Sequence, residues 1–101
     1  MNQTIIKAIK EKRCLSFMYD NHPRVVEPHC YGITRKEKEA IRCYQIRGTG
    51  KRPNESPCHL MTLDKIMSLQ LSLQLLEETF DKPRHGYSKG DEHMIRIFCE
   101  L

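Results

Sequence analysis

The sequence lacks a long apolar run. None of its hydrophobic stretches approaches the roughly 18 residues that a membrane-spanning helix needs. The amino terminus also lacks the hydrophobic segment of a signal peptide, because Lys7, Lys10 and Lys12 interrupt its apolar positions. We therefore expect a cytoplasmic protein that has no membrane partner.

The five cysteines lack the spacing of a disulfide framework or a zinc site. An odd number at irregular spacing is a poor disulfide pattern, and cytosolic thiols stay reduced. The nearest approach to a metal pattern is His29-Cys30 with Cys58-His59, but adjacent residues of a strand point to opposite faces. We expect reduced cysteines that act as small buried apolar residues, and neither a metal nor another cofactor.

Motifs of common enzyme classes are also missing. Gly48-Thr49-Gly50-Lys51 lacks the spacing of a phosphate-binding loop, and no serine stands in a nucleophile-elbow pattern. Cys30 directly follows His29, but nothing in the sequence indicates an oxyanion hole for a cysteine nucleophile. These absences favour a binding module rather than an enzyme.

The composition is typical of one small globular domain. With 101 residues, 39% of them hydrophobic and 30% charged, the chain has room for a single core. We therefore expect one domain over residues 1–101. The net charge of +4 suits an anionic partner without specifying one.

Hydrophobic periodicity predicts one helix followed by several short strands. Ile5, Ala8 and Ile9 belong to an apolar stripe at helical spacing, which predicts a helix from about Asn2 to Lys12. Alternating or β-branched patterns predict strands over 15–19, 24–27, 30–34, 40–47, 58–63, 67–73 and 94–99. Pro28 predicts an end to ladder pairing, a sheet edge or a bulge. This pattern is typical of a mainly β protein that closes into a small barrel.

Several segments resemble a known family. They are the Leu15–Tyr19 strand, the run Arg24-Val25-Val26-Glu27-Pro28-His29, the strand from Ile41 to Gly48, the segment from Leu60 to Ile66, and a tail from Phe80 to Leu101. Together they resemble the WYL domain over nearly the whole chain. The resemblance implies an Sm-like or SH3-like barrel with an N-terminal helix, and a regulatory role in sensing nucleic acid or nucleotide-like ligands.

The chain departs from the family pattern at three points. The strand where the naming triplet would stand reads Arg42-Cys43-Tyr44-Gln45, and Thr62 stands where the family often has arginine. The DNA-binding module that usually precedes the domain is missing from this sequence.

Two neighbouring strands carry a cluster of polar residues that suits an anionic ligand. Arginine presents a planar fork of donors to phosphate, tyrosine offers a stacking face, and glutamine can bind a base edge. The candidate ligand-binding residues are Arg24, His29, Arg42, Tyr44, Gln45 and Arg47. Strand parity places Gln45 on the face opposite Arg42 and Tyr44 unless a bulge intervenes.

A purely structural interpretation of this cluster stays open. Arg24 and Arg42 could form surface ion pairs with Glu27 or Glu39, Tyr44 could pack in the core, and His29 could satisfy a backbone group. In the tail, Arg84, His85 and Tyr87 predict an exposed loop, with a lid over the barrel mouth as the alternative.

Two functional hypotheses follow from the sequence. In the first, a free-standing WYL-like barrel binds a small anion or single-stranded nucleic acid through Arg24, His29, Arg42 and Tyr44. In the second, the chain is a protein–protein adaptor without a ligand pocket. Such an adaptor would dock through a strand edge or its helix onto another regulator or a second copy of itself, as a homodimer.

Overall fold

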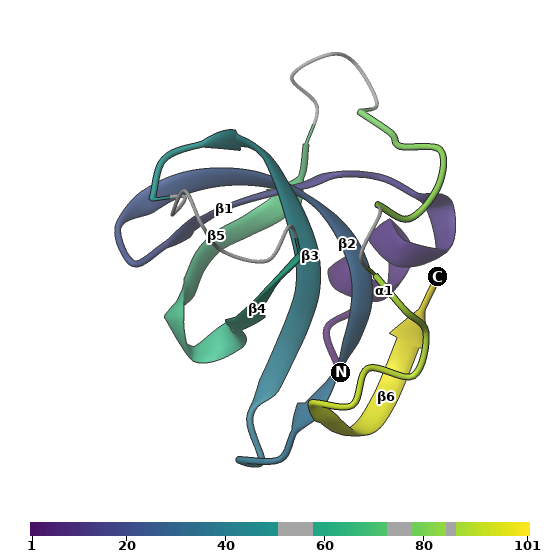
Figure 1. Cartoon of the computed structure of the whole chain (residues 1–101). Coiled ribbons are helices and arrows are strands. Elements are labelled where there is room, and N and C mark those ends of the chain that lie inside the picture. The colour runs from purple at the N-terminus through teal and green to yellow at the C-terminus, as the bar shows by residue number, and fades with distance from the viewer. Residues whose placement is uncertain (51–57, 73–77, 85–86) are drawn as a thin grey trace.

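The computed structural model describes residues 1–50, 58–72, 78–84 and 87–101. These residues form one α-helix, six strands and a short 3-10 turn, which Figure 1 shows in chain order. The elements are α1 (Gln3–Glu11), β1 (Leu15–Tyr19), β2 (His22–Thr34), β3 (Glu39–Gly48), β4 (Cys58–Thr62), η1 (Leu63–Lys65), β5 (Ile66–Leu71) and β6 (Met94–Glu100).

Helix α1 begins at an asparagine cap and ends in a left-handed residue. The Asn2 side chain accepts a hydrogen bond from the Ile5 backbone N–H at 3.1 Å, which satisfies a donor that the first turn leaves free. Lys12 ends the helix with a φ of 52°. The predicted apolar stripe is confirmed, because Ile5, Ala8 and Ile9 are all buried.

All strand pairs of the sheet are antiparallel, and the strand order is β4-β3-β2-β1-β5. β6 pairs with the second half of β2, beside α1 (Figure 1). The predicted strands 24–27 and 30–34 are one long strand, β2, whose register against β3 shifts between Pro28 and Cys30. Of the alternatives predicted for Pro28, the bulge is therefore confirmed, and this bulge lets β2 bend and serve two sets of partners.

The mainly β class with an N-terminal helix is confirmed, but a closed barrel is not. In the described part of the chain, no ladder joins β4 to β5, so the sheet stays open between these two strands. η1 carries the chain from β4 at one edge to β5 at the other, where β5 pairs with β1. β5 begins at Ile66, one residue before the predicted strand, and position 73 lies outside the described residues.

The core lies between α1 and one face of the sheet. Its buried members are Ile5, Ala8, Ile9, Leu15, Phe17, Val26, Tyr31, Ile41, Cys43 and Met61. Burying each large aliphatic side chain contributes about 1.5–3 kcal/mol. Tyr31 also fixes the helix to the sheet, because its hydroxyl accepts from the Asn2 N–H at 2.8 Å and donates to the Glu39 carboxylate.

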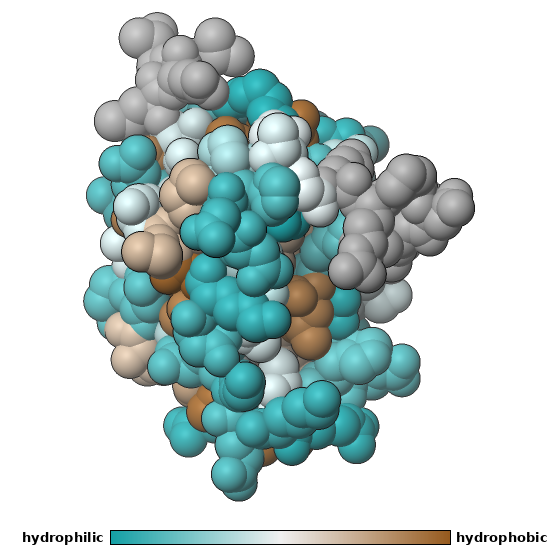
Figure 2. Space-filling view, turned by 90° about the vertical axis from the view of Figure 1, so that its left-hand side faces the viewer, coloured by the Kyte–Doolittle hydropathy of each residue, from teal (hydrophilic) through white to brown (hydrophobic). Residues whose placement is uncertain are grey.

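Hydrophilic side chains dominate the face shown in Figure 2, where the hydrophobic ones form small separate patches. Among the described residues the large exposed hydrophobic side chains are Met1, Met67 and Ile95. None of the described helices has the length and apolar character needed to cross a membrane.

Candidate functional site

The six candidate ligand-binding residues divide between two places. Arg24 and Gln45 have buried side chains that contact each other near the β1–β2 turn. The remaining four are His29, Arg42, Tyr44 and Arg47, and all of them contact a tail segment that crosses the other face of β2 and β3. We call this segment, residues 78–84 and 87–93, the strap. The predicted strand parity is confirmed, since Gln45 faces away from Arg42 and Tyr44.

Arg42 is held by a strap carboxylate. Its Nε lies 2.7 Å from Asp91 Oδ2 and its Nη2 lies 3.3 Å from Asp91 Oδ1, in a two-pronged pair. The side chains of Arg42 and Asp91 are only 16% and 5% exposed. Burial raises the pKa of the Asp91 carboxyl, but hydrogen bonds from Arg42 and from the His93 backbone N–H outweigh it, so the pKa is lowered.

Two further ion pairs join the strap to the sheet. Both Nη atoms of Arg47 bind the Glu78 carboxylate, at 2.5 and 2.6 Å, and Ser72 donates to the same carboxylate. Arg84 forms the reverse pair: it donates from the strap to Glu27 on β2 at 2.8 Å through both Nε and Nη2. The Arg84 guanidinium also lies over the Tyr44 ring, 4.4 Å from its centroid.

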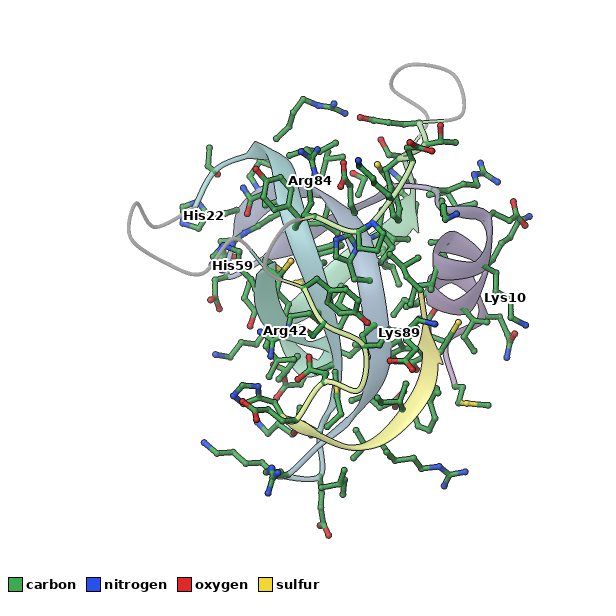
Figure 3. All side chains as sticks on the ribbon, turned by 45° about the vertical axis from the view of Figure 1, so that its right-hand side comes forward. Lys10, His22, Arg42, His59, Arg84 and Lys89 are labelled. Carbon is green, nitrogen blue, oxygen red and sulfur yellow. The ribbon has the colours of Figure 1, made fainter. Side chains whose placement is uncertain are left out.

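These contacts correct the predicted surface pairs. Neither Arg24 nor Arg42 pairs with Glu27 or Glu39, because Glu27 binds Arg84 and Glu39 accepts from Tyr31. Tyr44 is half-buried beneath Arg84 rather than in the core. Figure 3 shows Arg42 and Arg84 along the strap, far from Lys10 on the outer side of α1. For the tail, His85 lies outside the described residues, whereas Arg84 and Tyr87 pack onto β2 and β3.

His29 is sealed under the strap. Its ring is fully buried, with its centroid 5.6 Å from that of Phe80 and 5.1 Å from that of Tyr87. Its Nε2 accepts the Arg84 backbone N–H at 3.1 Å, which confirms the interpretation of His29 as a partner for a backbone group. Because the ring is buried against Phe80 and Tyr87, His29 supports the strap from β2 and is not a ligand contact in this conformation.

We expect the stability of the protein to fall as His29 becomes protonated. Burial lowers the pKa of His29 below its ordinary value of 6.5, with the Pro28 backbone and Glu27 opposing and Arg84 assisting. A lowered folded-state pKa gives stability that is present above the unfolded pKa and lost as the pH falls through the folded pKa. Protonation also removes the Nε2 acceptor of the Arg84 N–H.

Urea unfolding of wild type and His29→Gln at about pH 8 and about pH 5 measures this effect. The glutamine keeps an acceptor but cannot titrate, so its loss of stability between these pH values should be smaller. The same pH dependence in both proteins would show that His29 is not responsible.

Arg24 differs from the strap-bound arginines, because no carboxylate pairs with it among the described residues. Arg24 as a whole residue is only 7% exposed. Nη1 donates to Gln45 Oε1 at 3.3 Å and Nη2 donates to the Tyr19 carbonyl at 3.4 Å, and the guanidinium lies over the Tyr19 ring. Its Nε is buried and has no hydrogen-bond partner.

A small polar network holds this guanidinium in place. Gln45 is 2% exposed, and its Nε2 donates to the Thr49 carbonyl at 3.2 Å while its Oε1 accepts from Arg24. The Thr49 hydroxyl in turn lies 2.9 Å from Nδ1 of the exposed His22. Both hydrogen-bonding ends of Gln45 are therefore occupied in fixing Arg24, which explains the polar residue on the buried face of β3.

Arg24 opens onto a cavity of about 240 Å³, which we call the mouth. The mouth is lined by Tyr19, Asp20, Arg24, Gly50, His59, Leu60 and Met61. Gly50 has a φ of +78°, and a Cβ on it would lie 2.5 Å from Nη2 of Arg24 and 2.9 Å from Cγ of His22. Glycine thus lets the backbone come close to the guanidinium, where a side chain would clash with it. Figure 3 shows His22 and His59 at this side of the molecule.

Three wider hollows lie elsewhere among the described residues. Arg47 borders one of about 580 Å³, Arg42 one of about 480 Å³ and Arg84 one of about 510 Å³, and each of these guanidinium groups is paired with a carboxylate. Arg24 also lines the hollow of about 580 Å³. Arg24 is therefore the better candidate for binding an anion, and the mouth is smaller than the other hollow that it lines.

Sequence reasoning missed two parts of this arrangement. The strap carboxylates Glu78 and Asp91 had no signal, because they lie far from Arg47 and Arg42 in the chain. Gly50 did have a signal in the sequence, because Gly48 and Gly50 flank Thr49 and such glycines mark an unusual backbone conformation. We compared this run only with the phosphate-binding loop motif, which it does not match.

Most of the cysteines are buried, and two of them contact the strap region through their backbones: Arg42 donates to the Cys58 carbonyl, and the Cys14 N–H donates to the Glu78 carbonyl. Cys14, Cys30, Cys43 and Cys58 are buried and Cys99 is half-buried, which confirms the prediction that most are buried. Burial raises the pKa of every one of these thiols, to about 12 for Cys14 and Cys30. Within the described ranges, no group of three or more histidine, cysteine, aspartate or glutamate side chains could hold a metal ion.

The mouth thus combines a buried cation, a network that fixes it and a glycine backbone close beside it, an arrangement that suits an anionic group. No family model, no curated protein and no solved structure matches this chain.

Proposed function

We propose that this chain is a regulatory module that binds a small, nucleotide-like anion at the mouth. The observation that carries the proposal is the buried Arg24 guanidinium, which has no carboxylate partner among the described residues. Taking a charge out of water costs several kcal/mol unless an opposite charge compensates it. A bound anion supplies that charge, so ligand binding stabilises the folded protein.

The donors of Arg24 fit such a ligand. A guanidinium carries five N–H groups. Gln45 and the Tyr19 carbonyl take one each, on Nη1 and Nη2. Each Nη atom keeps a second N–H, and a planar pair of donors of this kind matches the oxygens of a phosphate.

The proposal moves the ligand away from the outer face of β3. Arg42 and Arg47 are already neutralised by Asp91 and Glu78, and Tyr44 is covered by Arg84. An oligonucleotide would have to displace three ion pairs to reach that face. Arg24 and Gln45 are therefore the candidate residues that the proposal retains as ligand-site residues.

We further propose that the chain is a cytoplasmic WYL-like domain and that its sheet is a variant of the Sm-like or SH3-like barrel. The antiparallel order β4-β3-β2-β1-β5, the bulged and bent β2 and the helix before β1 all support this fold. The regulatory role comes from the resemblance of the sequence to that family.

Isothermal titration calorimetry with adenosine 5′-monophosphate tests the proposed function. We compare wild type, Arg24→Gln and Arg96→Gln; the last removes the same charge from an exposed position on β6. Binding should weaken by at least about tenfold in Arg24→Gln, the value of a lost charge-assisted hydrogen bond, and by less than about twofold in Arg96→Gln.

Binding should also weaken with added salt, because the interaction is electrostatic. No binding by wild type at millimolar ligand would overturn the proposal and favour the protein–protein adaptor. Equal losses in the two variants would show that net charge, rather than the mouth, attracts the nucleotide.

A further inference from the structure

The geometry points to a narrower ligand class: we infer that the mouth accepts a terminal phosphoryl group carried on a sugar, and not a phosphodiester inside a nucleic acid chain. This inference rests on the proposed function, because it concerns the same guanidinium. Three features of the site support it: the depth of Arg24, the size of the mouth and the charge at its rim.

Arg24 lies at the inner end of the mouth. The residue is 7% exposed, and its neighbours Gln45 and Met61 are each 2% exposed. Gln45 Oε1 and the Tyr19 carbonyl accept from the guanidinium on its protein side. An internal phosphodiester continues through two ester oxygens, so both chain directions must leave its binding site. A terminal phosphoryl group has one ester oxygen, so only one chain direction has to leave a site as deeply buried as Arg24.

The size and charge of the site favour the same group. The mouth holds about 240 Å³, below the roughly 300–1,000 Å³ of sites that enclose a drug-sized ligand. A phosphoryl group with part of its sugar fits that space, while the rest of the ligand stays outside. A phosphomonoester carries about −1.5 to −2 charge near pH 7, whereas a diester carries one negative charge. The buried cation therefore attracts the monoester more strongly.

Asp20 adds a selective element at the rim. It lines the mouth, is exposed and has a φ of 50°, yet no ion pair joins it to Arg24. A carboxylate accepts hydrogen bonds from hydroxyl groups and repels a second anionic group. A sugar hydroxyl is a suitable neighbour for Asp20, and a further phosphate is not. The site should therefore prefer a monophosphate over a triphosphate.

Fluorescence anisotropy of short single-stranded RNA with a 3′ label tests the inference, because its first ribose keeps a 2′-hydroxyl for Asp20. The same oligonucleotide is prepared with a 5′-phosphate and with a 5′-hydroxyl, and adenosine 5′-monophosphate, ribose 5-phosphate and adenosine serve as competitors. Wild type should bind the 5′-phosphorylated strand at least about tenfold more tightly, which corresponds to about 1.4 kcal/mol. The two monophosphates should compete, and adenosine should not.

Two variants connect this preference to the mouth. Gly50→Ala places a methyl group beside the Arg24 guanidinium, and Arg24→Lys keeps the charge while removing the planar fork. Each variant should abolish the preference for the 5′-phosphate. Alanine at position 50 is strained because Gly50 has a positive φ, and this strain could unfold the protein. In that case Arg24→Lys alone provides the test.

The outcomes separate the inference from the proposed function. Equal binding of both strands by wild type, with both weakened by Arg24→Gln, would overturn the terminal-phosphate inference and leave Arg24 as an anion site. Failure of every phosphate compound to bind would overturn both.

Discussion

Arg24→Met should raise the free energy of unfolding by about 1–3 kcal/mol and at the same time abolish binding of adenosine 5′-monophosphate. Arg24 is a buried cation without a carboxylate partner among the described residues, so the folded protein bears its desolvation cost. Methionine has a similar length and fills irregular apolar space. In the variant, Gln45 Oε1 loses the hydrogen bond that Arg24 donates to it. This loss offsets part of the gain in stability, so the expected range begins at about 1 kcal/mol.

Urea unfolding of wild type, Arg24→Met and Arg96→Met measures this prediction without ligand. Arg96 is exposed, so its substitution should change the free energy of unfolding by less than about 0.5 kcal/mol. A loss of stability in Arg24→Met would mean that the cation contributes to the fold itself. Its burial would then no longer argue for a ligand. A gain of stability in Arg24→Met would show that the protein retains Arg24 at a cost in stability. Functional residues are often retained at such a cost.

Asp91→Asn should lower the free energy of unfolding by about 2–4 kcal/mol. The Asp91 side chain is 5% exposed and forms a two-pronged pair with Arg42, which is 16% exposed. The asparagine leaves a mostly buried guanidinium without its counter-charge. The backbone N–H of His93 also loses a charged acceptor, which weakens the strap near its end.

Asp64→Asn provides the matched control. Asp64 also binds a basic side chain, Lys38 at 2.9 Å, but both partners are about half exposed, at 49% and 51%. Exposed pairs contribute about 0–1 kcal/mol, so this variant should unfold almost as wild type does. Similar losses in Asp91→Asn and Asp64→Asn would contradict a strap held by buried ion pairs.

The Asp91 effect should also depend on pH. The folded-state pKa of Asp91 is lowered from its ordinary value of 3.8. A lowered carboxyl pKa contributes stability that is present above the unfolded pKa and is lost as the pH falls through the folded pKa. The stabilities of wild type and Asp91→Asn should therefore begin to converge as the pH falls below 3.8, and they should be similar once the pH lies below the folded-state pKa.

Local patterns predicted the elements of the fold well, because their signals lie within a few residues. The apolar stripe predicted α1 to within one residue at each end. The alternation of apolar residues predicted β1 with the same bounds that the structure has. In β3, the alternation of Ile41, Cys43 and Gln45 with more exposed neighbours correctly separated the two faces. Barrel closure was harder to predict, because it depends on how far η1 and the bends of β2 bring the sheet edges together.

The candidate site depended on contacts between distant parts of the chain. Arg42 and Asp91 are 49 residues apart, and Glu27 and Arg84 are 57 apart, so no spacing rule connects them. The polar cluster predicted from the sequence contains residue types that suit an anion, but its members lie in two different regions of the structure. Tertiary structure separates Arg24, which has no carboxylate partner among the described residues, from Arg42 and Arg47, whose charges the strap already neutralises.

The most direct test of the central claim follows the arginine Nε–H signals by nuclear magnetic resonance while adenosine 5′-monophosphate is added. Assignments come from Arg24→Lys, Arg42→Lys and Arg84→Lys spectra. We expect the Arg24 signal to shift at the lowest ligand concentration, while the signals of Arg42 and Arg84 stay in place because both remain in their ion pairs with Asp91 and Glu27. Shifts of Arg42 and Arg84 with an unchanged Arg24 signal would contradict the central claim and place the ligand on the strap face instead.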